Sequence, residues 1–287
     1  MSTPSCAWCG TPIDPSKPDC PACGAATDIT GGKTASGWSS LPARRDLATL
    51  SFGSSKCQIS GTMVPVADLE LAGDDWVYFS HHVLLWKDSI TIEAQSLKGV
   101  FKRLLAGMPL VMTQTKGPGR IAFTRDAPGE MIALPLHPGQ SIDVKEHLFL
   151  LASSTVQFDW FDTGVWFDHK DDDDTETFYP IGPLMDRFSA VGAPGLLLLH
   201  AHGHVQTRTL EAGHTILVKP TAFLFKDHSV DMELHFEHPA NTRWSNHRSV
   251  WLKLRGPGRV AIQSVAGHVE GEHVSINRSS RATRMQW

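Results

Sequence analysis

The sequence lacks the features of a membrane-spanning, secreted or nucleic-acid-binding protein. Its longest purely apolar run is far shorter than the ~20 residues that a membrane-spanning helix needs. The opening residues, MSTPSCAWCG, have no charged start followed by an apolar core, so no secretory signal is expected. The formal net charge of −4 provides no general attraction to nucleic acid or anionic lipid. We therefore expect a cytoplasmic protein.

Cysteine is scarce, and its placement argues against a disulfide framework. The chain has five cysteines in 287 residues, and four of them form two close pairs near one end. Cys57 stands alone and is expected to be a small buried apolar residue. In contrast, 24 glycines and 18 prolines are spread along the chain, which favours many turns over long helices. The length suits one large β-domain with an appendage, or two ordinary domains.

The N-terminal stretch CAWCGTPIDPSKPDCPACGA has the spacing of a metal site. Cys6 and Cys9, then Cys20 and Cys23, form two Cys-x-x-Cys pairs, each followed by glycine. Two such turns supply the four thiolates of a closed tetrahedral zinc site. A redox centre is the alternative, but it needs only one such pair followed by a helix. We predict a zinc ribbon over residues 1–26 that holds one structural Zn²⁺ per chain.

Residues 27–45 are rich in glycine, serine and threonine, and we predict a flexible linker there. Residues 46–276 follow as the main body. Within this body, GDDWVYFSHHVLLWKDSITIE from Gly73, GQSIDVKEHLFLLASSTVQFD from Gly139 and GHTILVKPTAFLFKDHSVDME from Gly213 align without a gap. Their apolar columns are spaced by two, the period of a strand with one buried face. Each segment is predicted to form three short strands, so the body is an all-β fold built from three repeats.

A second repeated motif, Gly-Pro-Gly-Arg, occurs in TKGPGRIAF (115–123) and LRGPGRVAI (254–262). We predict a hairpin corner at each copy, made by Gly117, Pro118 and Gly119 and by Gly256, Pro257 and Gly258. Positive φ is expected at Gly117 and Gly256, and proline restricts the turn. A phosphate-binding loop is the alternative, but no helix N-terminus follows the motif.

These motifs resemble the altered-inheritance-of-mitochondria family of mitochondrial-biogenesis proteins. The resemblance covers residues 46 to about 276 and depends on the Gly-Pro-Gly-Arg corner, PGQSIDVKEHLFLLASSTVQFD, and APGLLLLHAHGHVQTRTLEAGHTILV. It implies a fold similar to that of the trp RNA-binding attenuation protein, with three short double-stranded β-helix units per chain. It also implies homotrimers that form a ring. No catalytic residues are established for the family, so the resemblance transfers none.

Three histidines in LLLLHAHGHV form a second candidate metal site. His200, His202 and His204 alternate along a predicted strand, so their rings would line one face and could bind a metal ion. Related metal-binding cupins need glutamate and glycine at set distances, and Glu211 and Gly213 do not fit them. We favour a solvated strand face over a metal site.

Three further segments have simpler interpretations. Asp171–Asp174 lack the spacing of a calcium loop and are predicted to form a solvated acidic loop between the second and third repeats. The pattern after Ser96 predicts a short amphipathic helix over 97–106 that caps the β-body. Its basic residues leave peripheral membrane contact through residues 96–110 as the alternative. The basic tail, 277–287, is predicted to be disordered.

Three functions are compatible with these features. The first is a non-enzymatic scaffold, a homo-oligomeric β-ring, most simply a trimer, that displays zinc ribbons to protein partners. The second is a metal-dependent β-helix enzyme that uses the histidines, and the third is an RNA-binding ring. RNA binding needs basic residues in register, whereas Lys87, Lys145, Lys219 and Lys226 are irregularly placed. The body has no nucleophile–base pair, so the sequence favours the scaffold. Exposed strand edges at the terminal repeats favour ring closure.

Overall fold

The chain folds as an all-β protein, as the sequence predicts. The computed structural model describes residues 4–27, 33–42, 44, 46–95, 112–171, 174–237 and 249–265. The helical residues in these ranges form only two 3₁₀ turns, η1 (His81–Val83) and η2 (Pro220–Ala222). No helix in the described part of the chain has the length and apolar character needed to cross a membrane. Two predicted segments lie outside the described residues. They are the helix at 97–106, within the range 96–110 considered for membrane contact, and the tail at 277–287.

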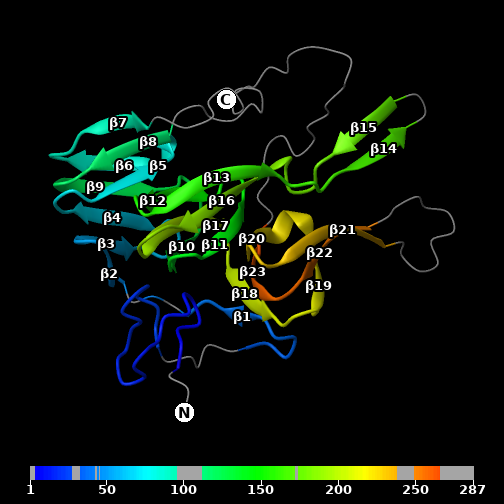
Figure 1. The fold of residues 1–287 in the computed structure, drawn as a ribbon, viewed down its shortest axis with the longest axis horizontal. Helices are drawn as coiled ribbons and strands as arrows, with labels where there is room; N and C mark the ends of the chain where they lie inside the picture. Colours follow the sequence, from blue (N-terminus) through cyan, green and yellow to red (C-terminus); the bar gives the residue numbers. More distant parts are fainter. Residues whose placement is uncertain are drawn as a thin grey trace.

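Three consecutive segments of the body each contain six core strands in the described residues (Figure 1). The first segment has β4 (Val66–Leu71), β5 (Trp76–Phe79), β6 (Leu84–Asp88), β7 (Ile92–Gln95), β8 (Met112–Lys116) and β9 (Gly119–Thr124). The second has β10 (Gly129–Leu136), β11 (Ser141–Lys145), β12 (Phe149–Ser153), β13 (Val156–Asp162), β16 (Leu184–Ala190) and β17 (Gly195–His202). The third has β18 (Val205–Leu210), β19 (Thr215–Val218), β20 (Phe223–Asp227), β21 (Asp231–Glu237), β22 (Ser249–Arg255) and β23 (Gly258–Gln263).

The strands of each segment pair in the same antiparallel pattern. The first strand pairs with the sixth, and the sixth with the third, as in β4·β9·β6, β10·β17·β12 and β18·β23·β20. The second pairs with the fifth, and the fifth with the fourth, as in β5·β8·β7, β11·β16·β13 and β19·β22·β21. Each segment therefore contributes two half-sheets of three strands.

Half-sheets from neighbouring segments join into larger sheets. The contact β5·β12 builds the six-stranded sheet β10-β17-β12-β5-β8-β7, and the contact β11·β20 builds most of a seven-stranded sheet. That sheet has the order β1-β18-β23-β20-β11-β16-β13 and includes β1 (Ser39–Ser40). At the ends of the body, β19-β22-β21 remains alone, and β4-β9-β6 is extended only by β2 (Thr49–Phe52) and β3 (Ser55–Ser60).

Burial follows the strand alternation expected from the sequence. In β3, Ser55, Cys57 and Ile59 point inward while the intervening residues are exposed. Cys57 is fully buried, as expected, and burial raises the pKa of its thiol to about 12. One large hydrophobic cluster runs from β2 through the second segment, and a second fills the third segment. The N-terminal cysteines belong to the first of these clusters.

The Gly-Pro-Gly-Arg motifs are corners between sheets, and the predicted hairpins are wrong. β8 belongs to the six-stranded sheet and β9 to the five-stranded sheet, so the strands around Pro118 do not pair with each other. The strands around Pro257, β22 and β23, likewise lie in different sheets. Positive φ occurs at Gly119 (156°) and Gly258 (137°), not at the first glycine of each motif. A Cβ atom added to the first glycine of each motif would clash with backbone atoms. At Gly256, for example, it would lie 2.4 Å from the backbone oxygen of Glu211.

A third corner, between β16 and β17, was missed in the sequence because it lacks the arginine and reads VGAPGL. Gly195 ends this corner, and a Cβ there would lie 2.4 Å from Val156 Cγ2. A Cβ added to Gly119 would lie 2.9 Å from Ile90 Cβ, and one added to Gly258 would lie 2.8 Å from Val230 Cγ2. The three contacted residues occupy one column of the sequence alignment. Glycine is therefore required at the same place in all three segments.

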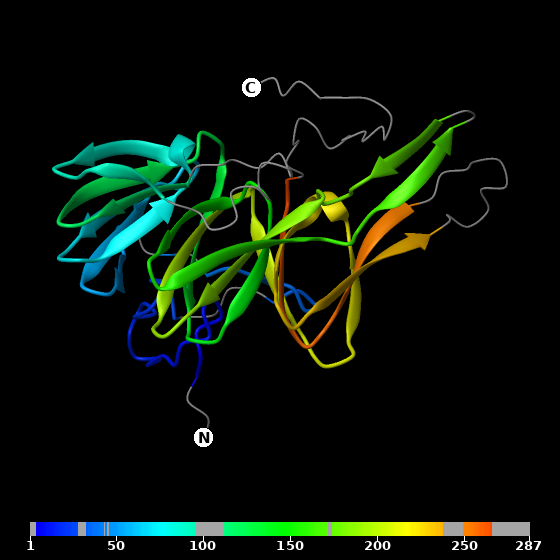
Figure 2. The ribbon, with the colours of Figure 1, turned by 45° about the horizontal axis from the view of Figure 1, so that its top comes forward.

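Two predicted loops contain strands. The acidic loop is a hairpin inside the second segment, formed by β14 (Phe167–Asp171) and β15 (Asp174–Phe178), and it projects from the other sheets (Figures 1 and 2). Its base is held by Phe167, which stacks on Phe178 with ring centroids 5.6 Å apart. Within the range predicted as a linker, Ser39–Ser40 forms β1 and pairs with Thr207 and Gln206 of β18. This part of the range therefore lies on the body.

Candidate metal centre

The four N-terminal cysteines lie on two turns with the same local structure. In the first turn the N–H of Gly10 donates to the carbonyl of Cys6, and in the second Gly24 donates to Cys20, both at 2.9 Å. Both glycines have positive φ, 70° and 66°. Each turn is closed by a short antiparallel bridge, Ser5 with Pro12 and Asp19 with Ala26. The repeated Cys-x-x-Cys-Gly spacing thus produces two matching turns.

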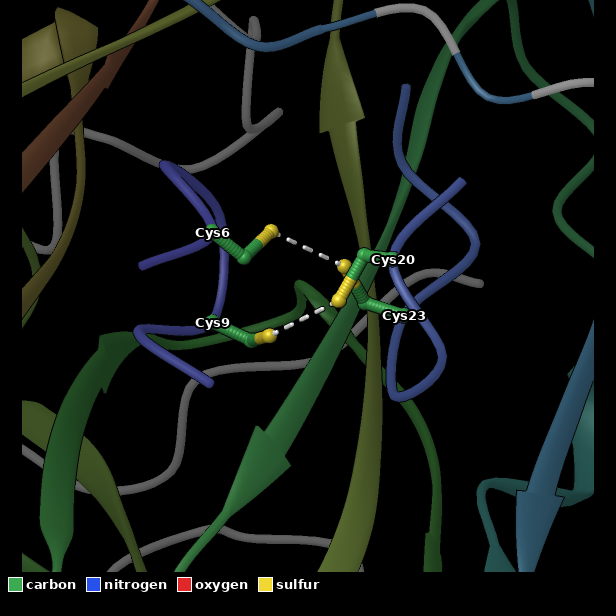
Figure 3. Close-up of side chains that lie close together, drawn as sticks. All are labelled: Cys6, Cys9, Cys20 and Cys23. Carbon is green, nitrogen blue, oxygen red and sulfur yellow. Dashed lines mark hydrogen bonds between the residues drawn. The ribbon is translucent and has the colours of Figure 1, made fainter. Parts of the chain in front are cut away.

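The two turns bring all four sulfur atoms together (Figure 3). The ligand atoms of Cys6, Cys9, Cys20 and Cys23 lie within 4.8 Å of one another, and all four residues are buried. Cys6 Sγ is 3.5 Å from Cys23 Sγ, and Cys9 Sγ is 3.7 Å from Cys20 Sγ. A tetrahedral ion with metal–sulfur bonds of about 2.3 Å needs sulfurs about 3.8 Å apart. The four thiols fit such an ion.

The four thiols strongly affect one another's protonation. Hydrogen bonds donated by neighbouring thiols, first that of Cys23, lower the pKa of Cys9 to about 2. The pKa of Cys23 is raised well above its ordinary value by its hydrogen bonds with Cys6 and Cys9 and by burial. One thiolate is therefore favoured, and each further deprotonation places another negative charge in the same buried volume. A bound cation removes this repulsion and stabilises four thiolates.

Contacts on several sides hold the cysteine turns against the body. Trp8, between the first two cysteines, is only 5% exposed, and its indole N–H donates to the carbonyl of Pro42 at 3.1 Å. The carbonyl of Trp8 accepts a 2.7 Å hydrogen bond from Arg259 Nη1 of β23. At the second turn, Gly24 packs closely against Ala48, because a Cβ added to the glycine would lie 3.0 Å from Ala48 Cβ. The cysteines belong to the same hydrophobic cluster as Leu50 of β2.

A cavity of about 580 Å³ is lined by residues of both the first cysteine turn and the body. They include Cys6 and Cys9 of the turn, and Ser141, His228 and Arg259 of the body. Arg259 is held there by Asp227, which accepts hydrogen bonds from its backbone N–H at 2.7 Å and from Nη2 at 3.2 Å. The four-cysteine cluster therefore lies beside polar side chains of the body.

The ligand atoms of the three histidines do not lie together at one point among the described residues. Among the described residues, the four cysteines are the only group of three or more potential ligands whose atoms lie close together. His200 is fully buried and its Nε2 donates to the carbonyl of Ala127 at 3.0 Å, while His202 meets it edge-on with ring centroids 5.5 Å apart. His204 is exposed and makes separate contacts, from Nδ1 to Glu130 Oε1 at 2.7 Å and from Nε2 to Ser40 Oγ at 2.9 Å.

The expected solvated strand face is wrong at His200. β17 lies between β10 and β12, and both of its faces are buried from Gly195 to Ala201. Burial, with Arg125 and His202 nearby, lowers the pKa of His200 to about 4. The ring is therefore a neutral core residue.

The body matches the sequence model of a known family, described as Mitochondrial biogenesis AIM24, over residues 57–265. The chain belongs to the AIM24 family. The matched range begins in β3 and ends just after β23, so the four cysteines lie outside it. The AIM24 assignment confirms the family that the sequence motifs resemble.

The fold is also similar to the X-ray crystal structure of a protein from Streptococcus pyogenes. That similarity has a TM-score of 0.56 at 18% sequence identity and covers 74% of this chain and 94% of the other. At this identity the similarity concerns the fold alone. A comparison with curated proteins finds no match.

Sequence reasoning missed the contacts that join the cysteine turns to the AIM24 body. Arg259 has the same motif position as Arg120, whose guanidinium is exposed and lies 3.7 Å from Glu70. Nothing in the local sequence distinguishes the two arginines. Only the folded chain places Arg259 beside Trp8.

Proposed function

We propose that the protein is a non-catalytic scaffold in which one structural zinc ion stabilises an N-terminal ribbon packed on an AIM24 body. The closed set of four buried thiols carries this proposal. A catalytic zinc has three protein ligands and an open position for water or substrate, whereas a structural zinc has four protein ligands. Zinc in this site would fix the two turns and so position Trp8 against Arg259. The family description, mitochondrial biogenesis, is the biological context that we propose for the scaffold.

We further propose that the three segments are short double-stranded β-helix units of the kind found in the trp RNA-binding attenuation protein. Their common pairing pattern and their shared corner glycines support this interpretation. The homotrimeric ring expected from the sequence is the assembly that we propose for such units. In a ring, each copy would present its zinc ribbon to protein partners, so weak single contacts would add up to firm multivalent binding.

Zinc analysis of the full-length protein tests the scaffold's metal centre. We expect about one zinc ion per chain, and loss of that zinc in the Cys20→Ser/Cys23→Ser variant. The Cys57→Ala variant is the matched control and should retain its zinc, because Cys57 lies in β3 outside the cluster. Wild-type protein without zinc, or a double variant with undiminished zinc, would show that the four cysteines are not the site.

A further inference from the structure

Arg44 lies beside the second cysteine turn, within the range that the sequence predicts to be a flexible linker. Its backbone forms an isolated antiparallel bridge with Ala25, two positions after Cys23. The carbonyl of Ala25 accepts a 2.7 Å hydrogen bond from the N–H of Cys20. The main chain of Arg44 is therefore attached to the turn that supplies two of the four thiols.

The second turn also packs against the first strands of the body. A Cβ added to Gly24 would lie 3.3 Å from Leu50 Cδ2. Leu50 of β2 is paired in turn with Cys57 of β3. Arg44, the second turn and Cys57 are therefore gathered at one contact between the cysteine module and the body.

The guanidinium of Arg44 has a buried nitrogen, Nη1, with no hydrogen-bond partner in the described part of the chain. A buried charge is costly when it loses water without gaining an opposite charge. Burial accordingly lowers the pKa of the Arg44 guanidinium, whereas negative charge on Cys57, Cys23 or Glu130 raises it. These three side chains are the candidates for a compensating charge.

Two of the three candidates are poor counter-charges. Cys57 is fully buried, and burial raises the pKa of its thiol to about 12, so this thiol is neutral near pH 7. Glu130 already accepts a 2.7 Å hydrogen bond from His204 Nδ1, and its side chain is 36% exposed, so solvent screens its charge. Cys23 remains, as a member of the four-thiol cluster. A cysteine that binds zinc does so as a thiolate.

We propose that Arg44 is the counter-charge of the zinc–thiolate centre and increases its affinity for zinc. Four thiolates around one Zn²⁺ leave a net charge of about −2 in a buried site. The guanidinium offsets part of this charge, and the attraction is stronger in the protein interior than in water. This inference rests on the structural zinc proposed above and names a residue, not itself a ligand, that determines how tightly the ion is held.

Zinc competition on full-length protein tests this role. A chromophoric chelator titrated against zinc-loaded protein reports the zinc affinity. Arg44→Met removes the charge and keeps an unbranched side chain, and we expect it to weaken zinc binding by about 10–100-fold, as is typical for groups that support metal ligands. Arg44→Lys keeps the positive charge and should bind zinc nearly as tightly as the wild type. Equal losses in the two variants would overturn the role of the charge.

Arg125→Met is the matched control. Arg125 also has a buried Nη1 without a partner among the described residues, but its charge acts on His200 and His202. This variant should keep the zinc affinity of the wild type. A loss as large as that of Arg44→Met would reflect general loosening of the fold and would overturn the inference.

Chemical denaturation with and without zinc separates counter-charge from packing. Because ligand binding and stability are linked, Arg44→Met should lower the stability of the zinc-loaded protein by more than that of the apoprotein. A loss that is equal in the two forms would assign Arg44 a packing role only and contradict the proposal. If Arg44→Met does not fold, Arg44→Gln removes the charge with a polar side chain and takes its place in both measurements.

The possible outcomes separate this inference from the function proposed above. Zinc-loaded wild-type protein whose affinity is unchanged by Arg44→Met would overturn the role of Arg44 and leave the zinc centre intact. Wild-type protein that binds no zinc would overturn the zinc centre itself, and with it the need for a counter-charge.

Discussion

Arg259 Nη1 donates a 2.7 Å hydrogen bond to the backbone carbonyl of Trp8, although 251 positions separate the two residues. Trp8 lies between two cysteines of the candidate metal site, and Arg259 lies just after the last corner of the body. The guanidinium is held in place by Asp227 on β20. One arginine therefore links the zinc module, as we propose it, to the far end of the AIM24 body.

Replacing Arg259 with alanine should loosen the module. A hydrogen bond to a charged group contributes about 1.5–3 kcal/mol, so we expect a fall of about 2 kcal/mol in the free energy of unfolding. Trp8 should become more exposed, which is measurable as a red shift of tryptophan fluorescence and as faster proteolysis before β2. Arg120→Ala is the matched control, because Arg120 has the same motif position but an exposed side chain. Equal effects of the two variants would contradict the link between Arg259 and the module.

The carboxylate of Asp143 should be essential to the junction between β11 and β20. It is fully buried and accepts hydrogen bonds from Arg187 Nε at 2.6 Å and from Lys226 Nζ at 2.8 Å. Burial opposes its ionisation, but these bonds outweigh burial and hold the pKa of Asp143 below its usual range. Asp143→Ala leaves the buried ammonium of Lys226 without this partner, and should cost about 3–5 kcal/mol in chemical denaturation.

A double variant separates charge loss from lost packing at Asp143. Asp143→Leu/Lys226→Met removes both buried charges and replaces them with apolar side chains, while Arg187 loses its carboxylate partner in both variants, so the comparison concerns the buried charge of Lys226. We expect it to be clearly more stable than Asp143→Ala. If both variants were equally destabilised, the ion pair would not be the cause.

Stability should depend on His200 between about pH 6.5 and pH 4. Burial lowers the pKa of His200 to about 4 in the folded protein, whereas an unfolded histidine has a pKa of about 6.5. In that interval the unfolded chain binds a proton that the folded chain does not, so stability falls as the pH falls. The contribution reaches about 3 kcal/mol near pH 4. Denaturation of His200→Gln across this interval should show a shallower pH dependence, and parallel curves would contradict the assignment.

Glycines in the corners and in the turns should respond differently to substitution. A Cβ on Gly256 would lie 2.4 Å from a backbone oxygen, whereas Gly139 has open space but a φ of 86°. Gly139→Ala should cost about 1–2 kcal/mol from backbone strain, and Gly139→Asn less, since asparagine tolerates positive φ. Gly256→Ala and Gly256→Asn should both cost more than this in thermal unfolding. Recovery of stability in Gly256→Asn would show that conformation, rather than space, demands glycine there.

Several properties could be predicted from the sequence because they depend on local spacing. The alternation of apolar residues at every second position predicts strands, and the all-β class is confirmed. The two Cys-x-x-Cys-Gly motifs predict a shared four-thiol site, and the four sulfurs do lie together. The order of the motifs also indicated the AIM24 family, which is now confirmed.

Other properties were decided only by tertiary structure, because they depend on residues far apart in the chain. The Gly-Pro-Gly-Arg motif shows a turn, but the pairing partners of β8 and β9 determine that it joins two sheets. The alternation of the histidines suggests one solvated face, but the folded chain buries His200 fully and places its ring against the carbonyl of Ala127. The two arginines of the repeated motif are equivalent in sequence, and only the position of Trp8 makes Arg259 a docking residue. Local patterns determine which strands and turns form, whereas neighbours brought together by folding determine what each side chain contacts.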